Sequence, residues 1–151
     1  MDRALVVIDE MESSDELLRE AGELAAGAGA SLVIFSPLSE DAYEEDASVL
    51  SEIEAVERTS FDKNPEHLAR SAADQAASEQ LDDLDVEYET RGTIVDSGER
   101  ATAIVEAATA TECDYVFLIG KRRSPTGKAI FGETAQDVLL NFDGRVVVTM
   151  E

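Results

Sequence analysis

The sequence has a single cysteine and a single histidine among its 151 residues, and each shortage excludes a class of protein. Cys113 has no second cysteine to pair with, so no disulfide can form within the chain, and a reducing compartment fits. We expect it to be a small buried residue. His67 has no second histidine or cysteine placed to share a metal ion, and no Ser/His/Asp set can be assembled around it. The sequence therefore predicts no catalytic residue and no metal ligand.

Basic residues and long apolar runs are also scarce. Twelve Lys and Arg residues stand against 34 Asp and Glu residues, and the formal charge of −22 argues against nucleic acid or an anionic membrane surface as a partner. No apolar run approaches the ~20 residues that span a bilayer, and the first residues lack the layout of a signal peptide. We expect a cytoplasmic protein.

The acidic residues are spread along the chain, and only three of the basic residues are lysines. This pattern favours a halophilic protein, because 1 M salt screens repulsion between carboxylates within about 3 Å. An ordinary acidic protein is the alternative.

One domain over residues 1–151 is expected at this length and an apolar content of 44%. Apolar runs predict strands at residues 4–8, 32–35 (ended by Ser36 and Pro37), 86–90 (at an edge of the sheet), 115–119 and 146–149. Helical spacing and capping residues predict helices at about 14–28 (capped by Ser13), at 64–81 (capped by Asn64), after Asp96 and Glu99, which can cap it, and after Gly132. The apolar faces of the first, second and last of these helices include Leu24, Ala72 and Leu139, respectively. Residues 38–62 are acidic and weakly periodic, and they are expected to form an insertion over the strand tips that contains a short helix.

The alternation of strands and helices predicts an α/β protein with a parallel sheet and helices on both of its faces. Ligands bind such sheets beyond the carboxyl ends of the strands, where the strand order reverses. If the first and fourth strands are central neighbours, Asp9 and the loop after Gly120 meet at this point.

That loop is the most basic part of the chain. Residues 121–128 contain four of the twelve basic residues, and Gly132, Glu133 and Thr134 then open a helix. Because a glycine-containing loop that feeds a helix N-terminus is a common phosphate-binding arrangement, we expect an anion to bind here.

Taken together, these segments resemble the universal stress protein family over nearly the whole chain. The matching segments are Val6–Asp9, Leu32–Pro37, Asp114–Gly120, Ser124–Lys128, Gly132 and Val138–Leu139. The resemblance implies a three-layer, doubly wound sheet of five parallel strands in the order 3-2-1-4-5, the adenine nucleotide alpha-hydrolase-like fold. It also implies a homodimer that pairs through the last strand, although a strand packed under helices is the alternative there. The acidic composition makes the sequence haloarchaeal in type.

Nucleotide-binding members of this family carry the motif GxxG(x9)G[ST] after the fourth strand, and this chain matches it in part. Gly120 matches the first glycine, whereas Arg123 stands at the second and Gly127 follows later. Gly132 comes one residue early for the last glycine, so Glu133 falls on the hydroxyl position and Thr134 comes next.

The resemblance implies a site for ATP, with Mg²⁺ accompanying it, and at most slow ATP hydrolysis. Asp9 would hold the ribose and Pro37 would lie beside the adenine. The phosphates would contact Gly120, Gly127, Gly132 and Thr134, and their charge would be neutralised by Arg122, Arg123 and Lys128.

Two other interpretations stay open. Arg123 blocks the close approach of a phosphate, and Glu133 competes with it for the helix N–H groups, which favours a universal stress protein that binds no nucleotide and works as a dimeric interaction module. Asp9 and Glu10 after the first strand are also typical of a phosphorylation receiver domain, which holds Mg²⁺ there. Against the receiver, the predicted third strand ends without an aspartate and no lysine follows the last strand.

Overall fold

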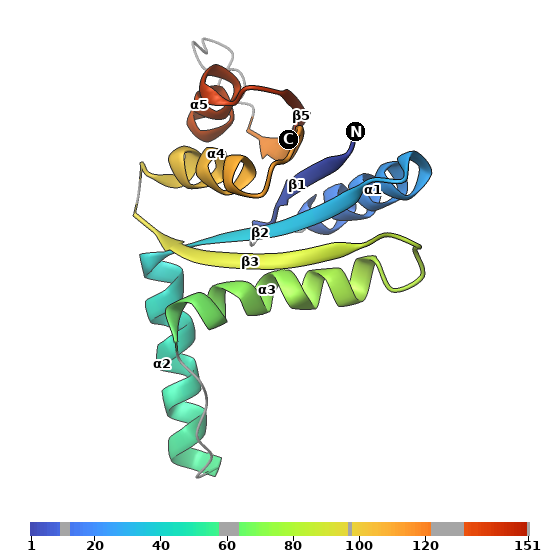
Figure 1. The fold of residues 1–151 in the computed structure, drawn as a ribbon. Coiled ribbons are helices and arrows are strands. Elements are labelled where there is room, and N and C mark those ends of the chain that lie inside the picture. The colour runs from blue at the N-terminus through green and yellow to red at the C-terminus, as the bar shows by residue number, and fades with distance from the viewer. Residues whose placement is uncertain (10–12, 58–63, 97, 122–131, 151) are drawn as a thin grey trace.

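The computed structural model describes residues 1–9, 13–57, 64–96, 98–121 and 132–150. These residues form a parallel five-stranded sheet in the order β3-β2-β1-β4-β5 (Figure 1). Its strands are β1 (Arg3–Val7), β2 (Ser31–Ser39), β3 (Tyr88–Val95), β4 (Tyr115–Gly120) and β5 (Arg145–Met150). The helices are α1 (Ser13–Ala28), α2 (Glu40–Glu57), α3 (Pro65–Gln80), α4 (Arg100–Ala110) and α5 (Glu133–Asn141). The predicted fold class and strand order are confirmed.

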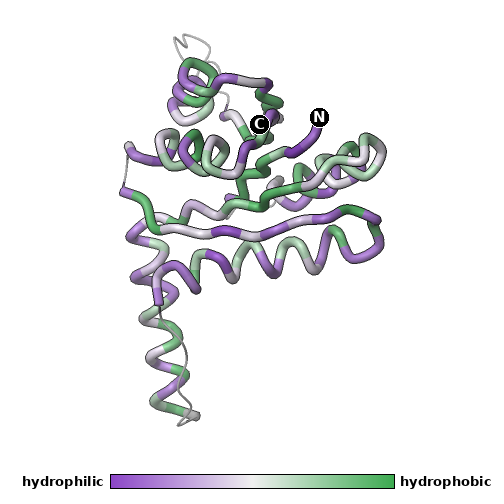
Figure 2. Tube along the Cα trace, viewed as in Figure 1, coloured by the Kyte–Doolittle hydropathy of each residue, from purple (hydrophilic) through white to green (hydrophobic). Residues whose placement is uncertain are grey.

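The sheet lies between two helical layers because its central strands are apolar on both faces. Along β1, Ala4 and Val6 pack toward α1 and α3, whereas Leu5 and Val7 pack toward α4 and α5. Figure 2 shows the hydrophobic residues of β1 and β2 gathered between helices of mixed polarity. Within the described parts of the chain, no helix is both long and apolar enough to cross a membrane.

The second strand does not end at Ser36 and Pro37 as predicted; it continues to Ser39. Proline is tolerated there because β1 has already ended. The N–H of Ile8 donates to the Phe35 carbonyl at 2.8 Å, so the backbone polar groups of Phe35 face β1. This direction repeats at every second residue of a strand, so the backbone of Pro37 faces the same side. The missing N–H of Pro37 therefore breaks no ladder bond.

The third strand is an edge strand as predicted, but it runs from Tyr88 to Val95 rather than from residue 86 to 90. Gly92 allows α3 to lie close against it, because a Cβ on Gly92 would be 2.2 Å from the backbone nitrogen of Arg70. The strand is followed by Asp96, so our reason for excluding a receiver at this point was wrong. The strand order excludes it instead, since receivers have the order 2-1-3-4-5.

The insertion predicted at residues 38–62 contains a helix much longer than expected. Ser39 still belongs to β2, and α2 then runs for 18 residues and extends away from the sheet (Figure 1). Residues 58–62 of the predicted insertion lie outside the described residues.

The side-chain cap predicted for α3 is confirmed. The one predicted for α4 is wrong, although that helix begins directly after Glu99 as expected. The Oδ1 atom of Asn64 accepts hydrogen bonds from the backbone N–H groups of Glu66 and His67 at 3.0 and 3.3 Å. Glu99 occupies the N-cap position of α4, but its side chain makes no capping bond. The side chain of Ser13, predicted to cap α1, lies outside the described residues.

Three predicted buried faces differ in detail from those observed. On α3 the buried face is Ala69, Ala73, Ala76 and Ala77, so the predicted Ala72 is exposed. Leu24 on α1 and Leu139 on α5 are 49% and 41% exposed. Because α3 is rich in alanine, its neighbouring faces have almost the same hydrophobicity. The face that is buried is therefore the one that lies closer to β3.

Cys113 is buried as predicted, and its Sγ lies 3.2 Å from the Thr111 hydroxyl oxygen. Burial raises the pKa of this thiol above its ordinary value. The thiol is therefore protonated at neutral pH and poorly reactive.

Candidate functional site

A cleft of about 710 Å³ lies beyond the carboxyl ends of β1 and β4. These two strands pair with each other, as the expected meeting of Asp9 with the loop after Gly120 requires. The cleft is bordered by the first residues of α2, α4 and α5, which follow β2, β3 and the segment after β4. It therefore occupies the point at which the strand order reverses, where open α/β sheets bind ligands.

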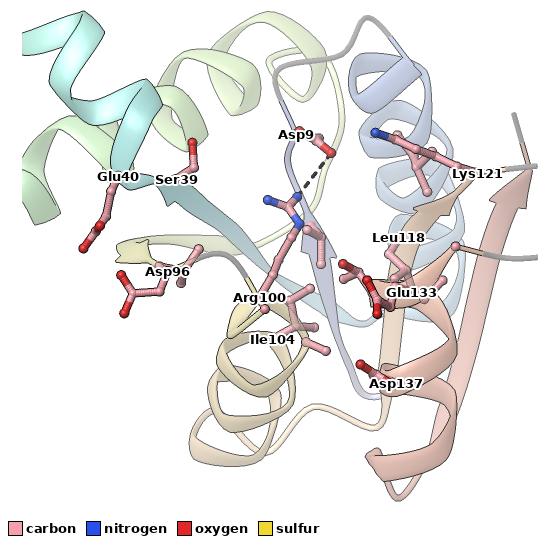
Figure 3. Close-up of a pocket in the computed structure, with 18 of the residues that line it drawn as sticks. Asp9, Ser39, Glu40, Asp96, Arg100, Ile104, Leu118, Lys121, Glu133 and Asp137 are labelled. Carbon is pink, nitrogen blue, oxygen red and sulfur yellow. Dashed lines mark ion pairs between the residues drawn. The ribbon is translucent and has the colours of Figure 1, made fainter. Parts of the chain in front are cut away.

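Asp9 and Arg100 form an ion pair inside this cleft (Figure 3). The Nη2 atom of Arg100 lies 3.2 Å from Oδ2 of Asp9, and Nη1 of the same guanidinium donates to the Pro37 carbonyl at 3.1 Å. The side chains of Arg100 and Asp9 are 26% and 32% exposed. One planar guanidinium thus links the tips of β1 and β2 from the first residue of α4.

The backbone of Asp9 is held separately from its side chain. Its N–H donates to the hydroxyl of Ser14 at 2.8 Å, and Ser14 is almost fully buried at the start of α1. This bond fixes the backbone where β1 ends, so the carboxylate is presented to the cleft by a rigid element.

The opposite wall of the cleft is the N-terminus of α5. Gly132 is the N-cap residue, and its φ of 82° and ψ of 158° belong to a region that only glycine adopts without strain. Its carbonyl accepts the first helical bond from Gln136 at 3.0 Å. The side chains of Glu133 and Thr134 follow, and both line the cleft. The N-terminus of α5 favours an anion, whereas Glu133 opposes one.

The cleft is strongly acidic. Among the described residues that line it, six are carboxylates and two are cations, Arg100 and Lys121. Figure 3 shows Glu40 and Asp96 on one side of Arg100, and Glu133 and Asp137 on the other. The Glu40 carboxyl shares a hydrogen bond with Asp96 and is repelled by its charge, and both effects raise the pKa of Glu40.

The structure brings together three of the predicted site residues, Asp9, Gly132 and Thr134, as lining residues of one cleft. Gly120 is buried at the end of β4, next to Lys121. Pro37 is buried in β2, where its carbonyl oxygen accepts the bond from Arg100. The other four, Arg122, Arg123, Gly127 and Lys128, lie outside the described residues, so their roles stay predictions.

The residue that sequence reasoning missed is Arg100. The sequence did contain a signal for Arg100, because this residue follows a strand and comes two residues after Gly98. It was missed because the third strand was expected to end five residues too early. The acidic lining residues Glu40, Asp96 and Asp137 were missed as well. In the described part of the chain, no three His, Cys, Asp or Glu side chains are grouped as metal ligands.

Comparison with solved structures finds the same fold in several proteins. A universal stress protein from Archaeoglobus fulgidus is 24% identical, with a TM-score of 0.62 and 98% of both chains covered. A universal stress protein in complex with cAMP is 18% identical, with a TM-score of 0.58 and coverage of 99% of this chain and 96% of that one. Another from A. fulgidus, in complex with dAMP, is 17% identical, with a TM-score of 0.56 and coverage of 98% and 97%.

At these identities the structural likeness establishes the fold alone. A search of curated proteins finds no match. The sequence model of the universal stress protein family, however, matches residues 1–149. The chain therefore belongs to the universal stress protein family.

Proposed function

We propose that this chain is a regulatory domain that binds an adenine nucleotide, with ATP as the first candidate, in the cleft between Asp9 and the N-terminus of α5. The observation that carries the proposal is that Asp9, Gly132 and Thr134, chosen from separate parts of the sequence, line a single cleft. Its volume of about 710 Å³ suits a ligand of nucleotide size.

The chemistry of the two walls supports the proposal. The Asp9 carboxylate is an acceptor for ribose hydroxyls, and the Pro37 carbonyl, which the lining residue Arg100 contacts, is an acceptor for the exocyclic amine of adenine. On the other wall, the glycine at position 132 allows a phosphate to approach the first N–H groups of α5. The cAMP and dAMP complexes of related proteins favour this function over that of an interaction module without a nucleotide.

The proposal is tested by thermal and urea unfolding in the presence of AMP or ATP, each with and without Mg²⁺. A ligand present at 100 times its Kd should stabilise the folded protein by about 2.7 kcal/mol. If neither nucleotide changes the unfolding transition, the proposal is wrong and the interaction module takes its place.

A pair of variants at Gly132 locates the site. Any side chain at Gly132 strains the backbone at its positive φ. A Cβ there would not clash, since it would lie 3.4 Å from the backbone nitrogen of Lys121. Gly132→Ala and Gly132→Asp share this strain, but only the aspartate adds a negative charge beside the phosphate. We expect both variants to lose similar stability and Gly132→Asp alone to lose nucleotide binding. Equal binding by the two variants would place the pocket elsewhere.

We also propose that the chain is a cytoplasmic homodimer that pairs through β5. Support comes from the position of β5 at the sheet edge and from Val147, which is 37% exposed on it. An uncovered apolar edge strand favours association with another copy of the strand. Light scattering should give the mass of a dimer for the wild type and that of a monomer for Val147→Asp; a monomeric wild type would contradict the proposal.

A further inference from the structure

We infer that Arg100 makes this cleft select a phosphorylated nucleotide over the unphosphorylated nucleoside. The inference rests on the proposed function, since it concerns the same cleft. Arg100 is the first residue of α4, and its guanidinium is bonded to Asp9 and Pro37, the two positions proposed for the ribose and the adenine. Arg100 is not part of the GxxG(x9)G[ST] motif, and it lies on a different element.

Arg100 joins the end of β1 to the longer strand β2. β1 ends at Val7, whereas β2 continues to Ser39, so the Pro37 carbonyl projects beyond the last residue of its neighbour. The guanidinium supplies the donor that a longer β1 would have supplied, and its second nitrogen contacts the carboxylate of Asp9. A guanidinium has five N–H donors in a planar fork, which allows it to serve two acceptors at once.

A bound nucleoside would compete with Arg100 for the two acceptors that Arg100 contacts. Both partners of Arg100 are acceptors, and the groups of adenosine proposed to meet them, the ribose hydroxyls and the exocyclic amine, are donors. A bound nucleoside would therefore satisfy Asp9 and the Pro37 carbonyl in place of Arg100. The guanidinium, whose side chain is only 26% exposed, would then pair with another acceptor.

The displaced guanidinium pairs with the strongest acceptor available in the cleft. Adenosine carries no anionic group, so it leaves the guanidinium only the carboxylates of the cleft wall. A phosphate accepts two parallel bonds from a guanidinium, and such bidentate pairs are stronger than contacts to a single exposed carboxylate. Arg100 and the phosphate-facing residues Gly132 and Thr134 line the same cleft, so the displaced guanidinium stays in the cleft that contains the proposed phosphate position.

The charge of the cleft opposes a phosphate. Six carboxylates line the cleft among the described residues, and an entering phosphate is repelled by them. Arg100 is one of the two described cations that offset this repulsion. Removal of Arg100 should therefore change the binding of the two ligands in opposite directions. The nucleoside gains access to two acceptors, and the nucleotide loses a cation.

The test compares the Kd values of adenosine and AMP, measured by isothermal titration calorimetry, in the wild type and in Arg100→Ala. We expect Arg100→Ala to bind adenosine at least as tightly as the wild type and to bind AMP more weakly. The preference for AMP should fall by about tenfold or more, the effect of losing one charge-assisted pair. Arg100→Lys keeps the charge without the fork, and it should retain more AMP binding than Arg100→Ala.

Arg91→Ala is the matched control, because it makes the same change in net charge outside the cleft. Arg91 lies on β3 with its Nε 3.9 Å from Glu89, and this variant should keep the wild-type preference. A preference for AMP that is unchanged in Arg100→Ala, or an equal weakening of both ligands, would overturn the inference while leaving the proposed function in place. If neither the wild type nor Arg100→Ala binds either ligand, the proposed function fails and this inference fails with it.

Discussion

Replacing Asp9 by asparagine should separate ligand binding from folding. The change keeps the shape of the side chain and removes its charge. It leaves the bond from the Asp9 N–H to Ser14 in place, because that bond involves only the backbone of Asp9. The lost ion pair with Arg100 has a separation of 3.2 Å and partly exposed side chains, and such pairs contribute about 1 kcal/mol or less. We therefore expect the free energy of unfolding to fall by less than about 1 kcal/mol.

The effect on AMP binding should be larger. A hydrogen bond to a charged group contributes about 1.5–3 kcal/mol, and a neutral one about 0.5–1.5 kcal/mol. The difference of about 1–2 kcal/mol corresponds to a five- to thirtyfold loss of affinity. The loss of affinity is partly offset, because Arg100 in the variant is held by an amide instead of a carboxylate and competes less with the ligand. This offset is no larger than the contribution of the ion pair itself.

Calorimetry with AMP gives the affinity, and urea unfolding in the absence of ligand gives the stability. A variant with wild-type stability and wild-type AMP affinity would refute the placement of the ribose at Asp9. A loss of stability well above 2 kcal/mol would refute the view that the Asp9 carboxylate serves the cleft rather than the fold.

The remaining predictions concern the fold, the acidic wall of the cleft and the response to salt. Gly92→Ala should destabilise the protein by about 3 kcal/mol or more in urea, because its Cβ would be 2.2 Å from the Arg70 nitrogen; Gly27→Ala, with nothing within 4 Å, should stabilise it by about 0.5–1 kcal/mol. The pKa of Glu40 is raised in the folded protein, so its contribution to stability is present below the ordinary glutamate pKa of about 4.3 and is lost as the pH rises through the raised value. Glu40→Gln imitates the protonated acid and should flatten the pH dependence of stability in that window, and an unaltered profile would contradict this assignment. A halophilic protein should lose secondary structure, followed by circular dichroism, as KCl is removed, whereas an ordinary acidic protein should not.

The sheet and its strand order were predictable because the signals are strong and local. The central strands are continuous runs of β-branched and aromatic residues that only a doubly covered sheet buries, and the alternation with helices restricts the topology to a few choices. The resemblance to a family then selected one order. Helix starts were predicted both with a side-chain cap, as at α3 where Asn64 caps the helix, and without one, as at α5 directly after Gly132.

Strand ends were less predictable because pairing, rather than composition, sets them. β2 and β3 extend each other, with Ser36 opposite Gly92 and Ser39 opposite Val95, over a length that β1 does not reach. Gly92 and Thr93, at the start of this extension, resemble a loop in the sequence. They are tolerated since an edge strand is open to solvent on one side.

The unequal strand lengths also explain why the site was predicted only in part. The rule that ligands bind beyond the strand tips identified Asp9, and the motif identified Gly132 and Thr134, because both signals lie beside the residues concerned. Arg100 enters the cleft for a different reason: β3 continues to Val95 and so delivers the start of α4 to the gap that β1 leaves beside β2. Its position depends on three strand ends that are distant in the sequence. A single substitution that shortens β3 should therefore alter the chemistry of the cleft without touching any of its lining residues.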